Sequence, residues 1–253
     1  MSPIPDDARL KKARIAFRRE GFTALPGFFS PARIAGIREQ LDRLICDAVP
    51  SMPAAHVVYE NPDDRSTLKQ LQDLHHHSPY FDELLNTGEL ALLARTVLGE
   101  EATGKNVEYF NKPPRTGKAT PPHQDAFYFN ISPPEAVTMW LALEEADSSN
   151  GCVSYVAGSH NRGMRAHSRT GLSGFSQSIV DYGLPEDLAC LRTVPAQPGD
   201  LLIHHAMTIH SAGPNRTPDR SRKALGFIYF ARSAQPDTVA RDAYLHALRT
   251  PLV

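Results

Sequence analysis

Two histidines and one aspartate have the residue types and the spacing of a mononuclear metal site. His123 and Asp125 are separated by one residue, and His210 follows far downstream. Two imidazoles and one carboxylate can hold Fe(II) on one face of an octahedron and leave the opposite face open for substrate and oxygen. In an extended segment, residues i and i+2 point to the same side, so His123 and Asp125 could reach one ion while Gln124 points away. The sequence therefore predicts an iron site made by these three residues.

The second half of this pattern also carries basic residues. His210 ends an apolar strand candidate, and Arg222 begins another. A guanidinium group engages a carboxylate through two parallel hydrogen bonds, so an arginine at this place could bind a dicarboxylate. Arg220 would lie on the same face as Arg222 if the segment is extended.

Composition limits the class of protein. The chain has 253 residues, of which 41% are hydrophobic and 22% charged, and a net charge of −1. These values are ordinary for a globular domain, and they do not indicate a nucleic-acid or anionic-membrane partner. There is no apolar run of roughly 18 residues, no secretory signal and only an odd set of three cysteines, which favours a reduced, cytoplasmic protein. We expect a small-molecule substrate, and the oligomeric state stays open.

The hydrophobic pattern predicts where helices and strands lie, and their order predicts the fold. Helices are expected up to about residue 20, over 31–47, and over 79–98 with an interruption near Gly88; residues 22–25 form a short strand. Strands are expected over 103–112, 124–130, 137–146, 151–157, 190–195, 200–210 and 222–232. This order predicts a mainly β fold with helices, a barrel or jelly roll with N-terminal helices packed outside it. We expect a single domain over 1–253, with helical support at 1–100, the core at 101–235 and a C-terminal tail at 236–253.

Three further segments carry expectations of their own. Residues 159–190 are rich in Gly, Ser, His and Arg, and so long a segment between strands is either a loop that covers the substrate, which we favour, or a mobile connection. The run at 75–77 is three consecutive histidines, which regular structure cannot turn toward one ion, so an exposed turn before a helix is expected. His204 and His205 should point to opposite faces of a strand, with His205 as the candidate partner of a metal ligand.

Ordered sequence blocks between about residues 105 and 230 resemble the phytanoyl-CoA dioxygenase (PhyH) family of Fe(II)- and 2-oxoglutarate-dependent oxygenases. The blocks are Asn-Lys-Pro-Pro at 111–114, His-Gln-Asp at 123–125, Trp140 with Asn-Gly-Cys at 150–152, Gly-Ser-His at 158–160, Gly-Asp at 199–200, His210 with Asn215, and Arg-Lys-Ala at 222–224. Each block is modest alone, and their order and spacing are specific. The resemblance implies a double-stranded β-helix, a cupin-like jelly roll.

The resemblance also implies cofactors and their residues. Fe(II), 2-oxoglutarate and O2 are expected, with the two histidines and the aspartate as ligands and as the catalytic centre. Arg222, rather than Arg220, matches the position that binds the far carboxylate of 2-oxoglutarate, and Lys112 matches a cosubstrate role. Relatives often place a hydroxyl two positions after the distal histidine. Here Ala212 takes that place and Ser211 offers the hydroxyl, which departs from the family pattern.

The expected reaction is hydroxylation of an unactivated C–H bond of a small polar metabolite or natural product, with formation of succinate and CO2. Asp125 favours hydroxylation over halogenation, because related halogenases replace this carboxylate with a small residue; desaturation, epoxidation and ring formation stay open. The substrate candidates are Tyr109, Asn111, Gln124, Tyr128 and Trp140. The alternatives are a cupin-like metalloenzyme that does not use 2-oxoglutarate and a non-catalytic binding module on the same fold.

Overall fold

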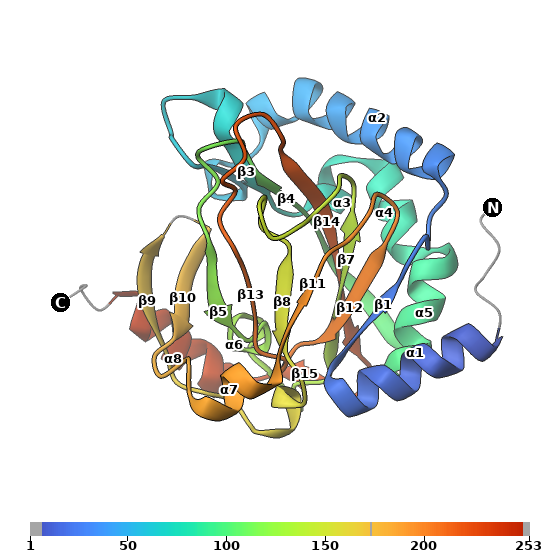
Figure 1. Ribbon diagram of the computed structural model, residues 1–253, viewed down its shortest axis with the longest axis vertical. Coiled ribbons are helices and arrows are strands. Elements are labelled where there is room, and N and C mark those ends of the chain that lie inside the picture. The colour runs from blue at the N-terminus through green and yellow to red at the C-terminus, as the bar shows by residue number, and fades with distance from the viewer. Residues whose placement is uncertain (1–6, 173, 250–253) are drawn as a thin grey trace.

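Two antiparallel sheets form the core of the protein (Figure 1). The structure, a computed structural model, describes residues 7–172 and 174–249. The larger sheet pairs, in order, β1 (Phe22–Leu25), β12 (Leu201–His205), β7 (Ala136–Ala142), β14 (Arg222–Ala231), β4 (Ala102–Lys112), β3 (Leu68–Leu71) and β2 (Val57–Tyr59). The smaller sheet pairs β11 (Leu191–Val194), β8 (Val153–Val156), β13 (His210–Ala212) and β5 (Thr120–His123). This arrangement confirms the predicted jelly roll with helices outside it.

Residue alternation divides the larger sheet into two chemically different faces. On β7, Met139 and Leu141 belong to the main hydrophobic core, whereas Thr138 and Trp140 face the space between the sheets. On β14, Phe227 packs in the same main core. Because successive side chains of a strand point to opposite faces, one face of these central strands can be apolar while the other carries functional groups.

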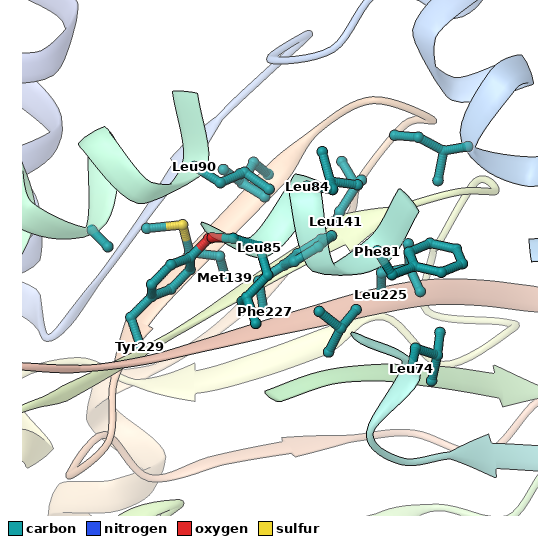
Figure 2. Close-up of a cluster of buried hydrophobic side chains, with 14 of the residues drawn as sticks. Leu74, Phe81, Leu84, Leu85, Leu90, Met139, Leu141, Leu225, Phe227 and Tyr229 are labelled. Atoms are coloured by element: carbon teal, nitrogen blue, oxygen red, sulfur yellow. The ribbon is translucent and has the colours of Figure 1, made fainter. Parts of the chain in front are cut away.

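Helices cover the apolar face of the larger sheet. They are α1 (Asp7–Glu20), α2 (Pro31–Asp47), α4 (Pro79–Asn86) and α5 (Gly88–Leu98), close to the predicted bounds. Figure 2 shows Phe81 and Leu85 of α4 against Leu225 and Phe227 of β14. The hydroxyl of Tyr229 donates a hydrogen bond to the carbonyl of Leu85 at 2.8 Å. The helices therefore bury one face of the sheet and leave the other to the site.

Several predicted segments differ from the structure. Residues 124–130 were expected as a strand, but they hold the short helix α6 (Ala126–Phe129), because the backbone of Asp125 is already helical. The strand expected over 200–210 is two strands, β12 and β13, which belong to different sheets. The expected tail contains the helix α8 (Thr238–Arg249), and its residues 250–253 lie outside the described residues.

The described residues of the segment 159–190 contain a β-hairpin and two short helices rather than one long loop, and Gly174 of the hairpin lines the cavity described below. The segment contains η4 (Ser159–Asn161), β9 (His167–Leu172), β10 (Phe175–Ile179) and α7 (Pro185–Cys190). Arg165 anchors its base through ion pairs of 2.7 Å with both Asp181 and Asp187. In Figure 1 the hairpin lies beside β5, at the flank of the smaller sheet.

The remaining elements are short. They are η1 (Val49–Ser51), η2 (Ala54–His56), η3 (Arg65–Thr67), α3 (Leu74–His77), β6 (Ile131–Ser132) and β15 (Gln235–Pro236). Within the described ranges, no helix has both the length and the apolar character that crossing a bilayer requires.

Candidate active site

A cavity of about 210 Å³ lies between the two sheets and contains the predicted metal residues. The smaller sheet contributes His123 and His210, and Asp125 follows directly after β5. The larger sheet contributes Lys112 and Arg222. The volume corresponds to roughly seven water molecules, a space for small molecules.

The ligand atoms of His123, Asp125 and His210 converge on one point. Oδ1 of Asp125 lies 3.5 Å from Nε2 of His123 and 3.6 Å from Nε2 of His210. Nδ1 of His123 donates to the carbonyl of Pro121 at 2.8 Å, and Nδ1 of His210 donates to the carbonyl of Thr208 at 3.0 Å. A carbonyl only accepts, so these bonds place the hydrogen on Nδ1 and turn the lone pair of Nε2 toward the common point.

The three residues are brought together by strand pairing and a turn. His123 ends β5 and is the register partner of His210 on β13. Asp125 begins α6 with helical backbone angles, so it reaches the site from a strand-to-helix turn. The expected alternation along one strand was therefore the wrong reason for the proximity of His123 and Asp125.

Two side chains hold the other oxygen of the aspartate. Oδ2 of Asp125 accepts from Oγ1 of Thr138 at 2.6 Å and from Nε2 of His204 at 3.1 Å. The hydroxyl of Tyr155 donates to Nδ1 of His204 at 3.3 Å. His205 points away instead, and its Nδ1 accepts from the amide of Met207. The two histidines do split between the faces, but His204 rather than His205 contacts the metal residue.

Charge states in this cluster suit metal binding. Burial opposes ionisation of Asp125, but the neighbouring imidazoles of His210, His123 and His204 outweigh it and hold the pKa of Asp125 well below its usual value. Burial, with the nearby His123 and His204, holds the pKa of His210 well below its usual value. The aspartate is therefore ionised and His210 neutral, the forms in which both residues bind a metal.

Arg222 is buried in the same cavity without an anionic partner. Its side chain is 4% exposed, and its guanidinium carbon lies 5.4 Å from the ring centroid of Trp140. Nε and Nη1 of Arg222 have no hydrogen-bond partner in the described part of the chain. Burial lowers the pKa of Arg222 to about 10. Arg220 instead lies at the surface, where it pairs with Glu145 at 3.1 Å and Asp147 at 2.8 Å.

Lys112 lies beside Arg222, because the two are register partners of β4 and β14. Its Nζ donates to Oγ1 of Thr120 at 3.2 Å and to the carbonyl of Lys118. Burial, then Arg222 and Lys69, hold the pKa of Lys112 well below its usual value. Adjacent buried cations are costly unless an anion joins them, so this end of the cavity suits a carboxylate.

The two residues that follow His210 are uncharged. Ser211 and Ala212 both line the cavity, and the Ser211 hydroxyl interacts with Tyr182.

The structure separates the five substrate candidates. Asn111, Tyr128 and Trp140 line the cavity. Tyr109 does not, because it lies on the opposite face of β4, 2% exposed within the main hydrophobic core.

Gln124 does not line the cavity either. Its Nε2 donates to the carbonyls of Gly163 at 3.0 Å and Met207 at 2.8 Å, and its Oε1 accepts from the amide of Arg165 at 2.9 Å. The side chain is fully buried, so it links α6 to the segment before β9 rather than facing a ligand.

Four residues of the site were not found from the sequence: Gln70, Glu108, Thr138 and His204. Alternation along β4 could have shown Glu108, since it shares a face with Phe110 and Lys112. Gln70 lies on β3, a strand that the polar composition around it did not reveal.

A second group of possible ligands lies away from this cavity. The ligand atoms of Asp73, His75 and His76 lie within 4.8 Å of one another, on and before α3. The expectation that this run is an exposed turn was wrong, because His75 and His76 are part of a short helix.

Comparisons with known proteins show the family of this chain. The model of the family Phytanoyl-CoA dioxygenase (PhyH) matches residues 17–224. A protein of Stutzerimonas stutzeri described as a probable alpha-ketoglutarate-dependent hypophosphite dioxygenase is 27% identical over 225 residues, which cover 86% of this chain and 77% of that protein. The mouse phytanoyl-CoA dioxygenase domain-containing protein 1 is 30% identical, and the match spans 64% of this chain and only 57% of that protein.

A solved structure shares the fold. The epimerase SnoN in complex with Fe3+, alpha ketoglutarate and nogalamycin RO has a TM-score of 0.74 and 26% identity, with 93% of this chain and 90% of that chain covered. These comparisons confirm the class of enzyme expected from the sequence, an iron- and 2-oxoglutarate-dependent dioxygenase. The chain belongs to the phytanoyl-CoA dioxygenase family.

Proposed function

We propose that this protein binds Fe(II) through His123, Asp125 and His210, binds 2-oxoglutarate with its far carboxylate at Arg222, and hydroxylates a C–H bond of a small polar metabolite, with release of succinate and CO2. One observation carries the proposal: three converging ligand atoms share a cavity with a buried guanidinium that has unpartnered donors.

The residues present fit both groups. Two imidazoles and one carboxylate, without a thiolate, suit Fe(II) and leave part of its coordination sphere to small molecules. The unpartnered Nε and Nη1 of Arg222 fit the two oxygens of a carboxylate. Lys112 adds a second positive charge beside it.

Each residue then has a physical task. The bound iron, with 2-oxoglutarate and O2, supplies the oxidising power. Thr138 and His204 hold Asp125 so that one oxygen faces the metal position. Arg222 and Lys112 orient the cosubstrate, and apolar side chains such as Trp140 keep water from this part of the cavity.

Two observations bear on which product the reaction forms. Asp125 occupies the position that a halide would need, which favours hydroxylation. The similar protein SnoN is described as an epimerase, so enzymes of this fold direct the same cofactors to different products. Product analysis by mass spectrometry decides this point, because hydroxylation adds one oxygen atom and epimerisation leaves the mass unchanged.

Anaerobic titration of metal-free protein with Fe(II) and then 2-oxoglutarate tests the proposal. We expect a visible metal-to-ligand charge-transfer band that Asp125→Ala abolishes and that needs more 2-oxoglutarate in Arg222→Ala. Arg220→Ala is the matched control and should titrate as the wild type does. Iron binding without a band would support the cupin-like alternative. No iron binding in the wild type would overturn the metal site and leave the non-catalytic binding module.

A further inference from the structure

A carboxylate lies in the same cavity at a distance from the cation pair. Glu108 is on β4 and shares a face with Phe110 and Lys112. Glu108 lies four positions before Lys112 on the strand, so their Cα atoms are about 13 Å apart at the usual rise of a β-strand. Among the described residues that line the cavity, Asp125 and Glu108 are the two acids, and Asp125 belongs to the metal site. Glu108 is therefore the acidic group that remains for another ligand.

Two amide side chains hold Glu108. One of them, Gln70, keeps an acceptor without a partner among the described residues, whereas Oδ1 of Asn106 accepts from the amide of Asp73 at 3.0 Å. Nδ2 of Asn106 donates to Oε1 of Glu108 at 2.8 Å, and Nε2 of Gln70 donates to Oε2 at 3.1 Å. A carboxylate only accepts, so this contact fixes the orientation of the Gln70 amide. Oε1 of Gln70 is buried and has no hydrogen-bond partner among residues 7–172 and 174–249.

Asn111, between Phe110 and Lys112 on β4, also borders the cavity. Its Nδ2 donates to the carbonyl of Leu68 at 2.8 Å, and by strand alternation its side chain lies on the face of β4 that carries Tyr109. Gln70 and Asn111 are 3% and 8% exposed, and both line the cavity. A buried acceptor without a donor is costly in a folded protein, so Oε1 of Gln70 fits a ligand that carries an N–H donor.

Glu108 forms no ion pair with a basic side chain of the described ranges. Burial, Asp125 and Asp73 raise its pKa, and the hydrogen bond from Gln70 opposes them. The nearby Glu60 contrasts with it, because Lys69 pairs with that carboxylate at 3.3 Å. A partly buried carboxylate inside a cavity is stabilised by a nearby cation, and the described part of the chain pairs none with Glu108.

The location of Glu108 is suited to a substrate of the metal site. The strand β14 separates β4 from β7, which carries Thr138, the partner of Asp125; two strand spacings are roughly 10 Å. Asp125 is close enough that its charge raises the pKa of Glu108. Phe110 and Ile228 line the cavity as apolar side chains. A small molecule held at Glu108 can therefore present an alkyl carbon toward the metal position.

We propose that the substrate carries a protonated primary or secondary amine, which Glu108 binds through its charge and which donates an N–H group to Oε1 of Gln70. This inference rests on the proposed function, since the amine is the anchor for the carbon that is oxidised. It deepens that function by naming a substrate class: an alkylammonium compound, as opposed to a neutral or an anionic one.

The proposed substrate class can be tested without turnover, by measuring how probe compounds bind to the anaerobic enzyme loaded with Fe(II) and 2-oxoglutarate. The probes are pentylamine, pentanol and the trimethylated quaternary derivative of pentylamine, and the readout is the change of the charge-transfer band on titration. We expect pentylamine to act at a concentration roughly tenfold or more below that of pentanol. The quaternary derivative should act less well than pentylamine, because it has the charge but no N–H donor.

Substitutions test which residues cause the expected preference for pentylamine over pentanol. Glu108→Gln keeps the shape and removes the charge, and it should abolish the advantage of pentylamine over pentanol. Gln70→Met removes the free acceptor and should weaken pentylamine several-fold. Glu83→Gln, an exposed change on α4, should keep the wild-type preference.

The outcomes separate this inference from the proposed function. A normal band without any preference for pentylamine, or a preference that survives in Glu108→Gln, overturns the amine while leaving the oxygenase intact. Equal effects of pentylamine and its quaternary derivative overturn the role of the N–H donors. Absence of the band in the wild type instead overturns the proposed function itself.

Discussion

Nε2 of His204 donates a hydrogen bond to Oδ2 of Asp125 at 3.1 Å, while Oδ1 of the same carboxylate faces His123 and His210. The two oxygens of Asp125 thus have different tasks: one is fixed by the protein and the other is directed at the metal position. Groups that orient a metal ligand in this way strengthen metal binding even though they do not touch the metal.

Replacing His204 should weaken iron binding. In His204→Gln the contact with both Asp125 and Tyr155 is disturbed, and we expect the iron affinity to fall by roughly 10- to 100-fold. Competition with a chelator of known affinity measures this. His205→Gln is the matched control, because His205 is the next residue of the same strand and points away from the site. Equal iron affinities of the two variants would contradict the orienting role.

Replacing Arg222 should weaken 2-oxoglutarate binding even when the charge is kept. A lysine cannot form two parallel hydrogen bonds with a carboxylate, and we expect Arg222→Lys to raise the KM for 2-oxoglutarate by roughly tenfold or more. Steady-state succinate release measures this. Arg220→Lys, at the surface ion pairs with Glu145 and Asp147, should leave the KM unchanged. A normal KM in Arg222→Lys would argue for another carboxylate site.

The stability of the metal-free protein should depend on pH through Glu108. Burial, aided by Asp125, raises the pKa of Glu108 from 4.5 to about 7, so the folded state holds this proton more tightly than the unfolded state. Its contribution to stability is therefore fully present below pH 4.5 and is lost as the pH rises through about 7. The loss is at most about 3 kcal/mol.

The variant Glu108→Gln cannot titrate and isolates this effect. We expect it to gain stability over the wild type progressively between pH 5 and 8, as measured by urea unfolding at several pH values. The difference between the two proteins cancels the titration of other groups, such as His167, whose pKa burial lowers to about 4. A difference that does not change with pH would show that Glu108 has an ordinary pKa.

Gln124 should matter for stability rather than for substrate binding. In Gln124→Leu the carbonyls of Gly163 and Met207 and the amide of Arg165 lose their buried partner. We expect a loss of about 3 kcal/mol in the free energy of unfolding. Urea unfolding measures it, with the exposed Gln197→Leu as the control that changes little. An unaffected stability, with altered substrate binding, would return Gln124 to the substrate candidates.

Much of the helix and strand pattern followed from the sequence, because it depends on local periodicity. The helices at 31–47 and 88–98 and the strands at 22–25, 102–112 and 222–231 lie within a few residues of their predicted bounds. Asp125 shows where local reasoning failed, since the aromatic run after it suggested a strand, and the structure forms a turn of helix there. The hairpin at 159–190 was missed because its strands pair mainly with each other and show little apolar alternation.

The sequence by itself determined which residues could make the metal site and which family the chain belongs to, because residue type, order and spacing are properties of the chain. Only the tertiary structure decided the surroundings of these residues. Pairing of β13 with β5 set the contact of His210 with His123, and the packing of the two sheets placed His204 against Asp125. Gln70 and Glu108 meet across β3 and β4, and no local pattern encodes that contact, because it depends on how strands distant in sequence pair.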